Sequence, residues 1–334
     1  MTGAAGADRA RMLGGAIVVL SIAAALLAPV LGPHGPGDQF PGLLNAPPTR
    51  PHLAADDGSW HRPFIYRWRL VDRLEQRYEE DRSARVPLQW FAGGHLASSS
   101  DDRTAPLMLL GADSFGRDVW SRLLFGARAS LGIAIVAALG SVLLGATIGG
   151  FAGYAGGTAD DVLMRGTDFI MVLPAMYVVL ALRSVLPLVL APTTVFLLLT
   201  GIFAIIGAPF MARGVRAIVR TERDLDYSTA ARALGASGAR VVFRHLLPAA
   251  RGFIGVEMTL LVPAFVVAEA TLSYIGLGFP DPIASWGTML HDASNVRVFV
   301  DFPWLLSPAV AMFAVVLGLN LTLQGRATGV ESMR

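Results

Sequence analysis

The feature that most restricts how this chain can fold is a set of six long apolar stretches. A helix needs about 20 apolar residues to cross the ~30 Å hydrocarbon core of a bilayer, because each residue adds 1.5 Å. Hydrophobic residues make up 54% of the chain and charged residues 16%, against about 25% charged in soluble domains. We therefore predict an all-α integral membrane protein with six transmembrane helices. They are expected at Met12–Gly32, Ser130–Tyr154, Thr167–Leu186, Thr193–Met211, Phe253–Ile275 and Trp304–Leu323.

Polar segments divide the chain into three regions. Residues 1–32 form a cytoplasmic N-terminus and the first helix, 33–110 an extracytoplasmic insertion, and 111–334 the core with the other five helices. The first apolar run, after Arg9 and Arg11, also fits a cleaved signal peptide, but no small-x-small site ends it cleanly. Both interpretations leave residues 33–110 outside.

Two further helices are expected on the outer side. Within the insertion, Ile65, Leu70, Leu74 and Tyr78 recur near helical spacing among charges, which predicts an amphipathic surface helix. A second surface helix is expected within Gly111–Leu131, where Asp118 and Arg122 are four residues apart and can pair on one face. Trp120 on that helix suits a membrane interface.

The second apolar stretch is rich in glycine. Small residues spaced by about four let membrane helices approach closely, so we predict that this helix packs tightly against a neighbour. The glycines are Gly132, Gly140, Gly145, Gly149, Gly150 and Gly153.

A long polar loop, residues 212–252, interrupts the apolar core. It contains eight arginines, namely Arg213, Arg216, Arg220, Arg223, Arg232, Arg240, Arg244 and Arg251. Arginine and lysine accumulate in the cytoplasmic loops of membrane proteins. Arg9, Arg11, Arg165, Arg326 and Arg334 fall on the same predicted side, whereas the short outer segments hold only Arg297. We therefore expect this loop and both chain termini in the cytoplasm.

The loop is expected to form two short helices joined by a glycine. Leu225 to Leu234 suits a helix that Gly235 ends in a left-handed conformation, and Ser237 can cap the next helix. Pro248 stops that second helix or opens the following span. A generic basic loop would lie on phospholipid headgroups. The order helix, glycine, helix, Leu-Pro favours a rigid projection presented to a protein partner.

The same loop resembles a known family. Ala230-Ala231, Gly235 and Leu247-Pro248 fit the spacing of the EAA coupling loop of bacterial ATP-binding-cassette (ABC) importer permeases. ARALGAS…FRHLLP, with His245, is similar to the dipeptide/oligopeptide/nickel subfamily. GADSFGRDVWSRLLFGARASL and EATLSYIGLGFPDPIASWGTML resemble its second, C-type permease. The resemblance covers most of residues 1–32 and 107–328. Thr229 stands where the motif has glutamate, so that ionic contact is absent or moved to Glu222 or Asp226.

The resemblance implies a type I-like permease and a set of site residues. For ATPase coupling these are Thr229, Ala230, Ala231, Gly235, Arg240, Arg244, His245, Leu247 and Pro248. As structural residues of the family motifs it implies Gly116, Arg117, Asp118, Arg122, Glu269, Gly276, Gly278, Trp286 and Gly287. It also implies a second permease subunit as heterodimer partner, two ABC ATPase subunits, an extracytoplasmic binding protein and surrounding membrane lipid.

Other candidate sites are weaker. Glu257 and Glu269 lie in an apolar stretch, where a carboxylate costs at least ~2.5 kcal/mol unless it faces a cavity or partner. Glu269 matches the family pattern and is expected to fix packing, and the pair could alternatively relay protons. Asp160 and Asp161 are expected to be solvated loop charges. His245 has no second ligand at metal spacing, so no metal site is predicted.

The sequence therefore predicts a permease subunit of a bacterial ABC importer for di- or oligopeptides, nickel or related small solutes, in the cytoplasmic membrane. No phosphate-binding loop or Ser/His/Asp arrangement is visible, so no enzymatic activity and no bound cofactor are expected, with ATP and Mg²⁺ on the partner ATPases. The dispersed arginines and a net charge of +2 favour no nucleic-acid partner. The alternatives are a proton-coupled transporter using Glu257 and Glu269, and an integral membrane enzyme.

Overall fold

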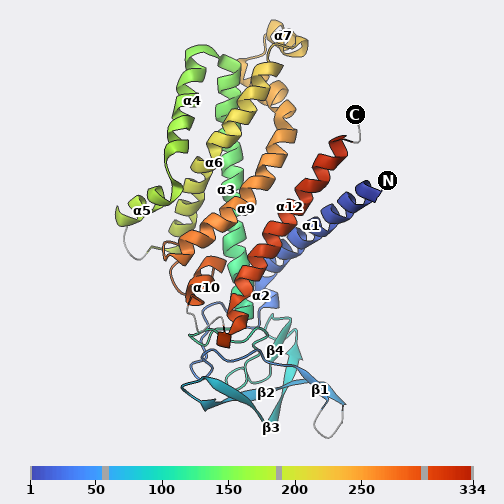
Figure 1. Cartoon of the computed structure of the whole chain (residues 1–334), viewed down its shortest axis with the longest axis vertical. Helices are drawn as coiled ribbons and strands as arrows, with labels where there is room; N and C mark the ends of the chain where they lie inside the picture. Colours follow the sequence, from blue (N-terminus) through green and yellow to red (C-terminus); the bar gives the residue numbers. More distant parts are fainter. Residues whose placement is uncertain (1, 55–59, 186–189, 295–299, 332–334) are drawn as a thin grey trace. The chain divides into compact units, whose positions relative to one another are not determined.

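The computed structural model describes residues 2–54, 60–185, 190–294 and 300–331 (Figure 1). The chain forms two compact units. One, here the helical unit, comprises Met1–Gly15, Gly132–Glu269 and Val316–Arg334, and the other, here the sheet unit, comprises Ala16–Leu131 and Ala270–Val315. The long helices α1 (Thr2–Leu26), α3 (Val119–Ala155), α9 (Arg251–Tyr274) and α12 (Ser307–Glu331) contribute residues to both.

Five helical segments among the described residues are long and apolar enough to cross a membrane. They are Asp8–Leu26, Val119–Ala155, Pro192–Glu222, Gly238–Tyr274 and Pro303–Leu323. Five of the six predicted stretches overlap these segments, so the prediction of a multi-span helical protein is confirmed at this level.

The remaining predicted stretch, Thr167–Leu186, is not found as one helix. It is divided between α4 (Gly157–Val172) and α5 (Ala175–Val185), while Leu186 lies outside the described residues. Leu173 between them is extended, with φ −75° and ψ 116°. The cause is Pro174, because the ring of a proline disfavours the helical conformation of the residue before it.

Close packing of α3 on α6 (Pro192–Glu222) organises the helical unit. A β-carbon on Gly145 would lie 2.5 Å from the Ala208 carbonyl oxygen, and one on Gly153 2.7 Å from that of Arg216. Gly149 faces Ala212 more closely still. The glycine stripe therefore allows the two backbones to approach as predicted.

A four-stranded antiparallel sheet occupies much of the insertion in the sheet unit. Its strands, in the order β1-β2-β3-β4, are His52–Ala54, Trp60–Asp72, Arg77–Trp90 and Ala97–Ser99. The predicted amphipathic helix is therefore wrong, and the chain is mostly helical rather than all-α as predicted. Ile65 pairs with Val86 and is fully buried, whereas Leu74 lies in the hairpin turn and is 85% exposed.

Local chemistry explains this hairpin. The segment Trp60–Asp72 is rich in aromatic and β-branched residues, which favour strands. Asp72 then accepts hydrogen bonds from the backbone amides of Leu74 (2.7 Å) and Glu75 (3.1 Å), which closes a turn in the middle of the predicted helix.

The segment before α3 is a loop, not a separate surface helix. Residues 111–118 turn back through an isolated bridge between Ala112 and Asp118, and the helix begins at Val119. With 37 residues, α3 is about 55 Å long at 1.5 Å per residue, so the predicted surface helix and the second span are one element.

Candidate functional site: the arginine-rich loop and the aspartate–arginine cluster

Residues 212–222 of the arginine-rich loop continue α6, which ends at Glu222 and therefore carries Arg213, Arg216 and Arg220. The part that follows begins with a short helix with a closed C-terminal turn. Helix α7 (Asp226–Ala233) follows α6 after an extended Leu225. Gly235 has φ +83°, and its amide donates to the Arg232 carbonyl (2.9 Å) while the Ala236 amide donates to Ala231 (3.0 Å). These two bonds form a Schellman motif, for which glycine is the preferred residue. The left-handed ending predicted at Gly235 is confirmed.

The second half is continuous with the next span. Helix α8 (Gly238–Val241) begins at Ser237, whose hydroxyl accepts from the Arg240 amide at 3.4 Å, as predicted. A π-helical turn (Val242–Leu246) and a 3-10 turn (Leu247–Ala250) then lead directly into α9. Pro248 lies in the first turn of the 3-10 segment, where its missing amide hydrogen is tolerated. It therefore opens the following span.

One face of the loop is packed into the helical unit. Val242 and Leu246 are fully buried in a cluster with Met211, Val215 and Val219 of α6. Arg240 and Arg244 lie on the exposed side. Gly150 of α3 also faces this loop, because a β-carbon there would lie 3.0 Å from Val242 Cγ1. The loop is thus held against two spans.

The opposite face carries large apolar side chains that the sequence analysis missed. Leu234 is 89% exposed at the end of α7, and Leu225, Tyr227 and Phe243 are 41–51% exposed. Among the predicted residues, Thr229, Ala230 and Pro248 are exposed, whereas Ala231, His245 and Leu247 are partly buried. Leu234, directly before the capping Gly235, could have indicated this exposed apolar surface, because a helix end that faces water normally carries a polar residue there.

Thr229 takes part in a local polar network. Its hydroxyl accepts from Arg232 Nη2 at 3.2 Å, and the same nitrogen donates to the Arg223 carbonyl at 3.0 Å. The Tyr227 hydroxyl donates to Glu222 at 2.6 Å. Burial, together with this carboxylate, raises the pKa of Tyr227 to about 12. Glu222 is therefore engaged within the loop.

Two ion pairs connect α4 to α6. Arg216 forms a bidentate pair with Asp160, and Arg213 pairs with Asp168. Asp160 is 4% exposed, so the expectation that it is a solvated loop charge is wrong, whereas Asp161 is exposed. The difference arises because Arg216 projects from the neighbouring helix, which the local sequence around Asp160 does not reveal.

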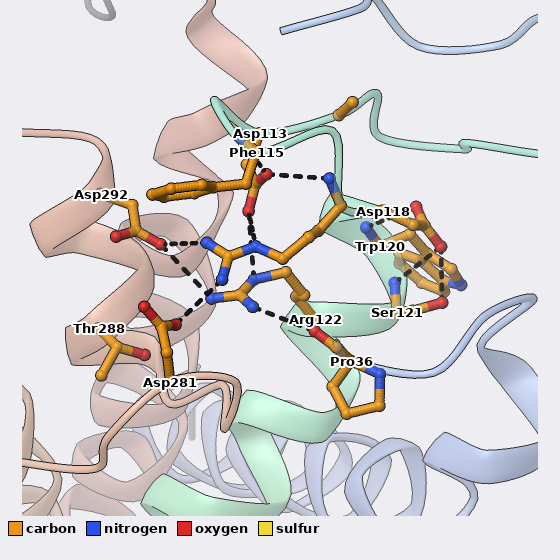
Figure 2. A network of polar contacts seen from close by, with 12 residues as sticks. Pro36, Asp113, Phe115, Asp118, Trp120, Ser121, Arg122, Asp281, Thr288 and Asp292 are labelled. Atoms are coloured by element: carbon orange, nitrogen blue, oxygen red, sulfur yellow. Dashed lines mark hydrogen bonds and ion pairs between the residues drawn. The ribbon is translucent and has the colours of Figure 1, made fainter. Parts of the chain in front are cut away.

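In the sheet unit, charged residues form what we call the aspartate–arginine cluster (Asp113, Arg117, Arg122, Asp281 and Asp292). Arg117 donates to Asp113 (2.7 Å), Asp281 (3.0 Å) and Asp292 (2.7 Å). Figure 2 shows the three carboxylates converging on the two guanidinium groups. Burial raises the pKa of Asp292, and both arginines oppose that shift.

The predicted pair between Asp118 and Arg122 is wrong. Arg122 instead contacts Asp113 (3.4 Å) and Asp292 (3.4 Å) and donates to the Pro36 carbonyl (3.1 Å). Asp118 accepts from the Ser121 hydroxyl (2.5 Å) at the start of α3, where it caps the helix, and lies 3.2 Å from His34 Nδ1. Helix capping therefore replaces the predicted pairing along one face.

The cluster brings together two motifs that are distant in sequence. Trp286, the first residue of α10 (Trp286–Asp292), is 2% exposed, and its indole donates to the Leu123 carbonyl at 3.1 Å. Gly116 and Gly276 have φ of +74° and +82°. Gly278 packs on Ser273 and Gly287 on the Ala270 carbonyl, so neither has room for a β-carbon.

Glu269 is fully buried, and Glu257 is partly buried.

The comparison with family models decides the identity. The model for binding-protein-dependent transport system inner membrane components matches residues 145–328, which include the whole arginine-rich loop. The chain belongs to this family. It is a permease, and the resemblance noted in its loop is confirmed.

Named relatives of this permease are peptide transport components. The oligopeptide transport system permease protein OppC of Bacillus subtilis is 38% identical over 216 residues, covering 64% of this chain and 68% of the relative. The dipeptide transport system permease protein DppC of the same organism is 41% identical over 211 residues, covering 63% and 64%. The glutathione transport system permease protein GsiD of Pectobacterium atrosepticum is 34% identical over 212 residues, covering 64% and 68%.

Proposed function

We propose that this permease is one membrane subunit of a bacterial ABC importer that moves di- or oligopeptides into the cell. The arginine-rich loop carries the proposal, because it is rigidly closed by Gly235 and presents exposed Leu234 beside basic residues. The names of the relatives support a peptide as substrate. Its partners would be a second permease, two ATPase subunits that bind ATP and Mg²⁺, and an extracytoplasmic binding protein.

In this mechanism the loop passes a movement of the ATPases to the spans. It faces the cytoplasm, as do both termini, and the ATPases dock on its exposed side. The loop packs against α6 and continues without a break into α9, so a push on α7 reaches both spans. Tilting of these helices switches access from outside to inside. ATP binding supplies the energy, and this chain has no catalytic role.

Reconstitution tests the proposed function. The chain is co-expressed with a second permease and two ATPase subunits, and uptake of a labelled tripeptide into vesicles is measured in the presence of the binding protein. ATP-dependent uptake is expected, with nickel uptake as the comparison. Uptake by this chain alone, driven by a proton gradient without ATP, would contradict the proposal.

Loop variants test the coupling role. Gly235→Val requires valine at φ +83°, which strains the turn although the space around it is open. Leu234→Asp places a charge on the docking side, whereas Leu247→Asp disturbs packing within the loop. We expect Gly235→Val and Leu234→Asp to abolish stimulation of ATPase activity by loaded binding protein while membrane insertion persists.

The matched control is Gly252→Val in α9, where the glycine is also surrounded by open space but its φ is not positive. It should couple normally. Normal uptake in Gly235→Val and Leu234→Asp would contradict the proposal that the loop couples the ATPases to transport.

A further inference from the structure

A cleft of about 530 Å³ lies in the sheet unit and shares no lining residue with the aspartate–arginine cluster. Its wall includes the turn between β2 and β3, with Glu75, Gln76, Arg77 and Tyr78. Asn45 and Trp304 also line it. The volume falls within the roughly 300–1,000 Å³ typical of small-molecule sites. The coupling role described above makes no use of this cleft.

The cleft combines charges of both signs with fixed aromatic groups. Glu75 lies in the turn and Arg77 begins β3; both are exposed, and Arg77 Nη2 lies 3.6 Å from the Glu79 carboxylate. The Tyr78 hydroxyl donates to the Leu44 carbonyl (2.7 Å), and the Trp304 indole donates to the Ala112 carbonyl (3.1 Å). Because their polar atoms are already bonded, these two aromatic side chains are held in place and can offer apolar surface to a ligand.

The backbone around the cleft is unusual. Asn45 has φ +52° and Gln76 has φ +50°, a region that residues other than glycine adopt rarely. The Asn45 side-chain nitrogen Nδ2 donates to Gln76 Oε1 at 2.7 Å, which joins the two segments. Such conformations concentrate at ligand-binding sites. Two of them meeting at one cleft indicate a wall shaped for binding.

We propose that this cleft binds a short peptide with free termini. Arg77 would bind the terminal carboxylate, Glu75 the terminal ammonium, and the aromatic wall a side chain. The lining carries two carboxylates, Glu75 and Asp301, and one guanidinium, Arg77. An anion would therefore meet two like charges here, whereas the ammonium and the carboxylate of a zwitterion each meet an opposite charge. The choice of a peptide rests on the proposed transport function. The cleft would let the permease itself select among the peptides that reach it.

Binding is tested on the full chain in nanodiscs by titration calorimetry. The probes are trialanine, trialanine amide and N-acetyl-trialanine. Arg77→Gln should weaken trialanine binding about tenfold, as expected for one lost charged hydrogen bond, and leave binding of the amide unchanged. Glu75→Gln should act in the same way on trialanine and leave binding of N-acetyl-trialanine unchanged. Both side chains are exposed, so the variants should fold.

Arg73→Gln is the control, because Arg73 is exposed in the same hairpin turn and does not line the cleft. It should bind all three probes like the unchanged chain. No binding of trialanine, or equal loss for trialanine and its amide in Arg77→Gln, would overturn the proposal.

The assembled transporter separates this proposal from the transport function. If it takes up trialanine with ATP while Glu75→Gln and Arg77→Gln bind and transport like the unchanged chain, the cleft proposal fails alone. If the cleft binds trialanine but the assembled complex never transports peptide, the transport function fails alone. If the variants weaken docking of the loaded binding protein but not binding of free trialanine, a protein occupies the cleft and our proposal is wrong.

Discussion

Arg117 is 2% exposed, and its guanidinium contacts carboxylates from two separate parts of the chain. Asp281 and Asp292 lie 164 and 175 residues further along the sequence. Lysine could not replace it, because an ammonium lacks the planar fork that reaches three acids at once. This one residue therefore joins the loop before α3 to the segment before and within α10.

Substitution of Arg117 should be strongly destabilising. In Arg117→Ala the buried carboxylate of Asp113 and the partly buried carboxylate of Asp292 lose their main partner, and breaking a buried pair in this way costs about 3–5 kcal/mol. Arg128→Ala in the following helix α3 is the control, since Arg128 is exposed. Thermal unfolding in detergent should separate the two variants clearly. Equal melting temperatures would contradict a structural role for the cluster.

His34 is a second residue whose surroundings set its chemistry. It is 5% exposed, with Nδ1 3.2 Å from Asp118 and Nε2 3.7 Å from Asp102. Burial alone would lower its pKa, but hydrogen bonding and the charges of these two carboxylates raise the pKa to about 9. The folded state therefore favours the protonated ring.

Stability should consequently depend on pH in the alkaline range. The contribution of His34, of the order of a few kcal/mol, is fully present below the unfolded pKa of about 6.5 and is lost as the pH rises through about 9. We expect the melting temperature to fall between pH 7 and pH 10, and His34→Gln to flatten that slope. If His34→Gln kept the same slope, His34 would not be its cause. His61→Gln in the exposed hairpin is the control and should keep the slope.

At the scale of elements, the contact of α3 with α6 depends on glycines, which have no side chain to keep the two backbones apart. Glycine occupies the α3 positions nearest to the α6 backbone, so van der Waals contact and the bond from Ser141 Oγ to the Ala204 carbonyl (3.1 Å) replace larger side chains. In lipid, where apolar burial gives little driving force, such close packing is a main source of stability.

Adding one methyl group to this contact should be costly. In Gly145→Ala the new carbon would lie 2.5 Å from both the Ala208 carbonyl oxygen and Met211 Cβ, so we expect a loss of about 1–3 kcal/mol. Gly132→Ala on the same helix meets only Phe196 at 3.6 Å and should be neutral or stabilising by up to about 1 kcal/mol. Melting of both variants in one detergent tests this difference. A loss of equal size in both would contradict the packing explanation, because alanine favours a helix more than glycine does.

Elements fixed by neighbouring residues could be predicted from the sequence, and others could not. The ending at Gly235 and the cap at Ser237 depend on atoms within three or four residues, and both were found. The spacing of Ile65, Leu70 and Leu74 also suggested a helix. That segment forms a strand because Ile65 is buried by Ala105 and Leu107, which lie far along the chain. The predicted span Thr167–Leu186 was also wrong, because it was based on apolar composition and did not take Pro174 into account.

At the scale of the whole molecule, the proposed orientation rests on where the arginines lie. The loop that carries Arg240 and Arg244 exposes them, as a cytoplasmic surface near anionic lipid and a partner would require. Ion pairs such as Arg117 with Asp292 could not be predicted in the same way, because their partners become neighbours only after the chain has folded.

Orientation can be tested directly because the chain has no cysteine. Ser100→Cys in the insertion and Ala233→Cys in the loop both introduce a thiol at an exposed position. In intact cells a membrane-impermeant maleimide should label only Ser100→Cys. Ala233→Cys should react only after the membrane is opened. The reverse pattern would invert the proposed topology.

The aspartate–arginine cluster also determines how such permeases can exchange parts. Arg117 lies before α3, whereas Asp281 and Asp292 lie after α9, so the two halves of the cluster are inherited through separate stretches of gene. A chimera that takes only residues 270–293 from a relative would set foreign carboxylates against native arginines. Exchanging residues 111–131 together with 270–293 keeps matched partners. We therefore expect the two segments to be exchangeable between relatives only together.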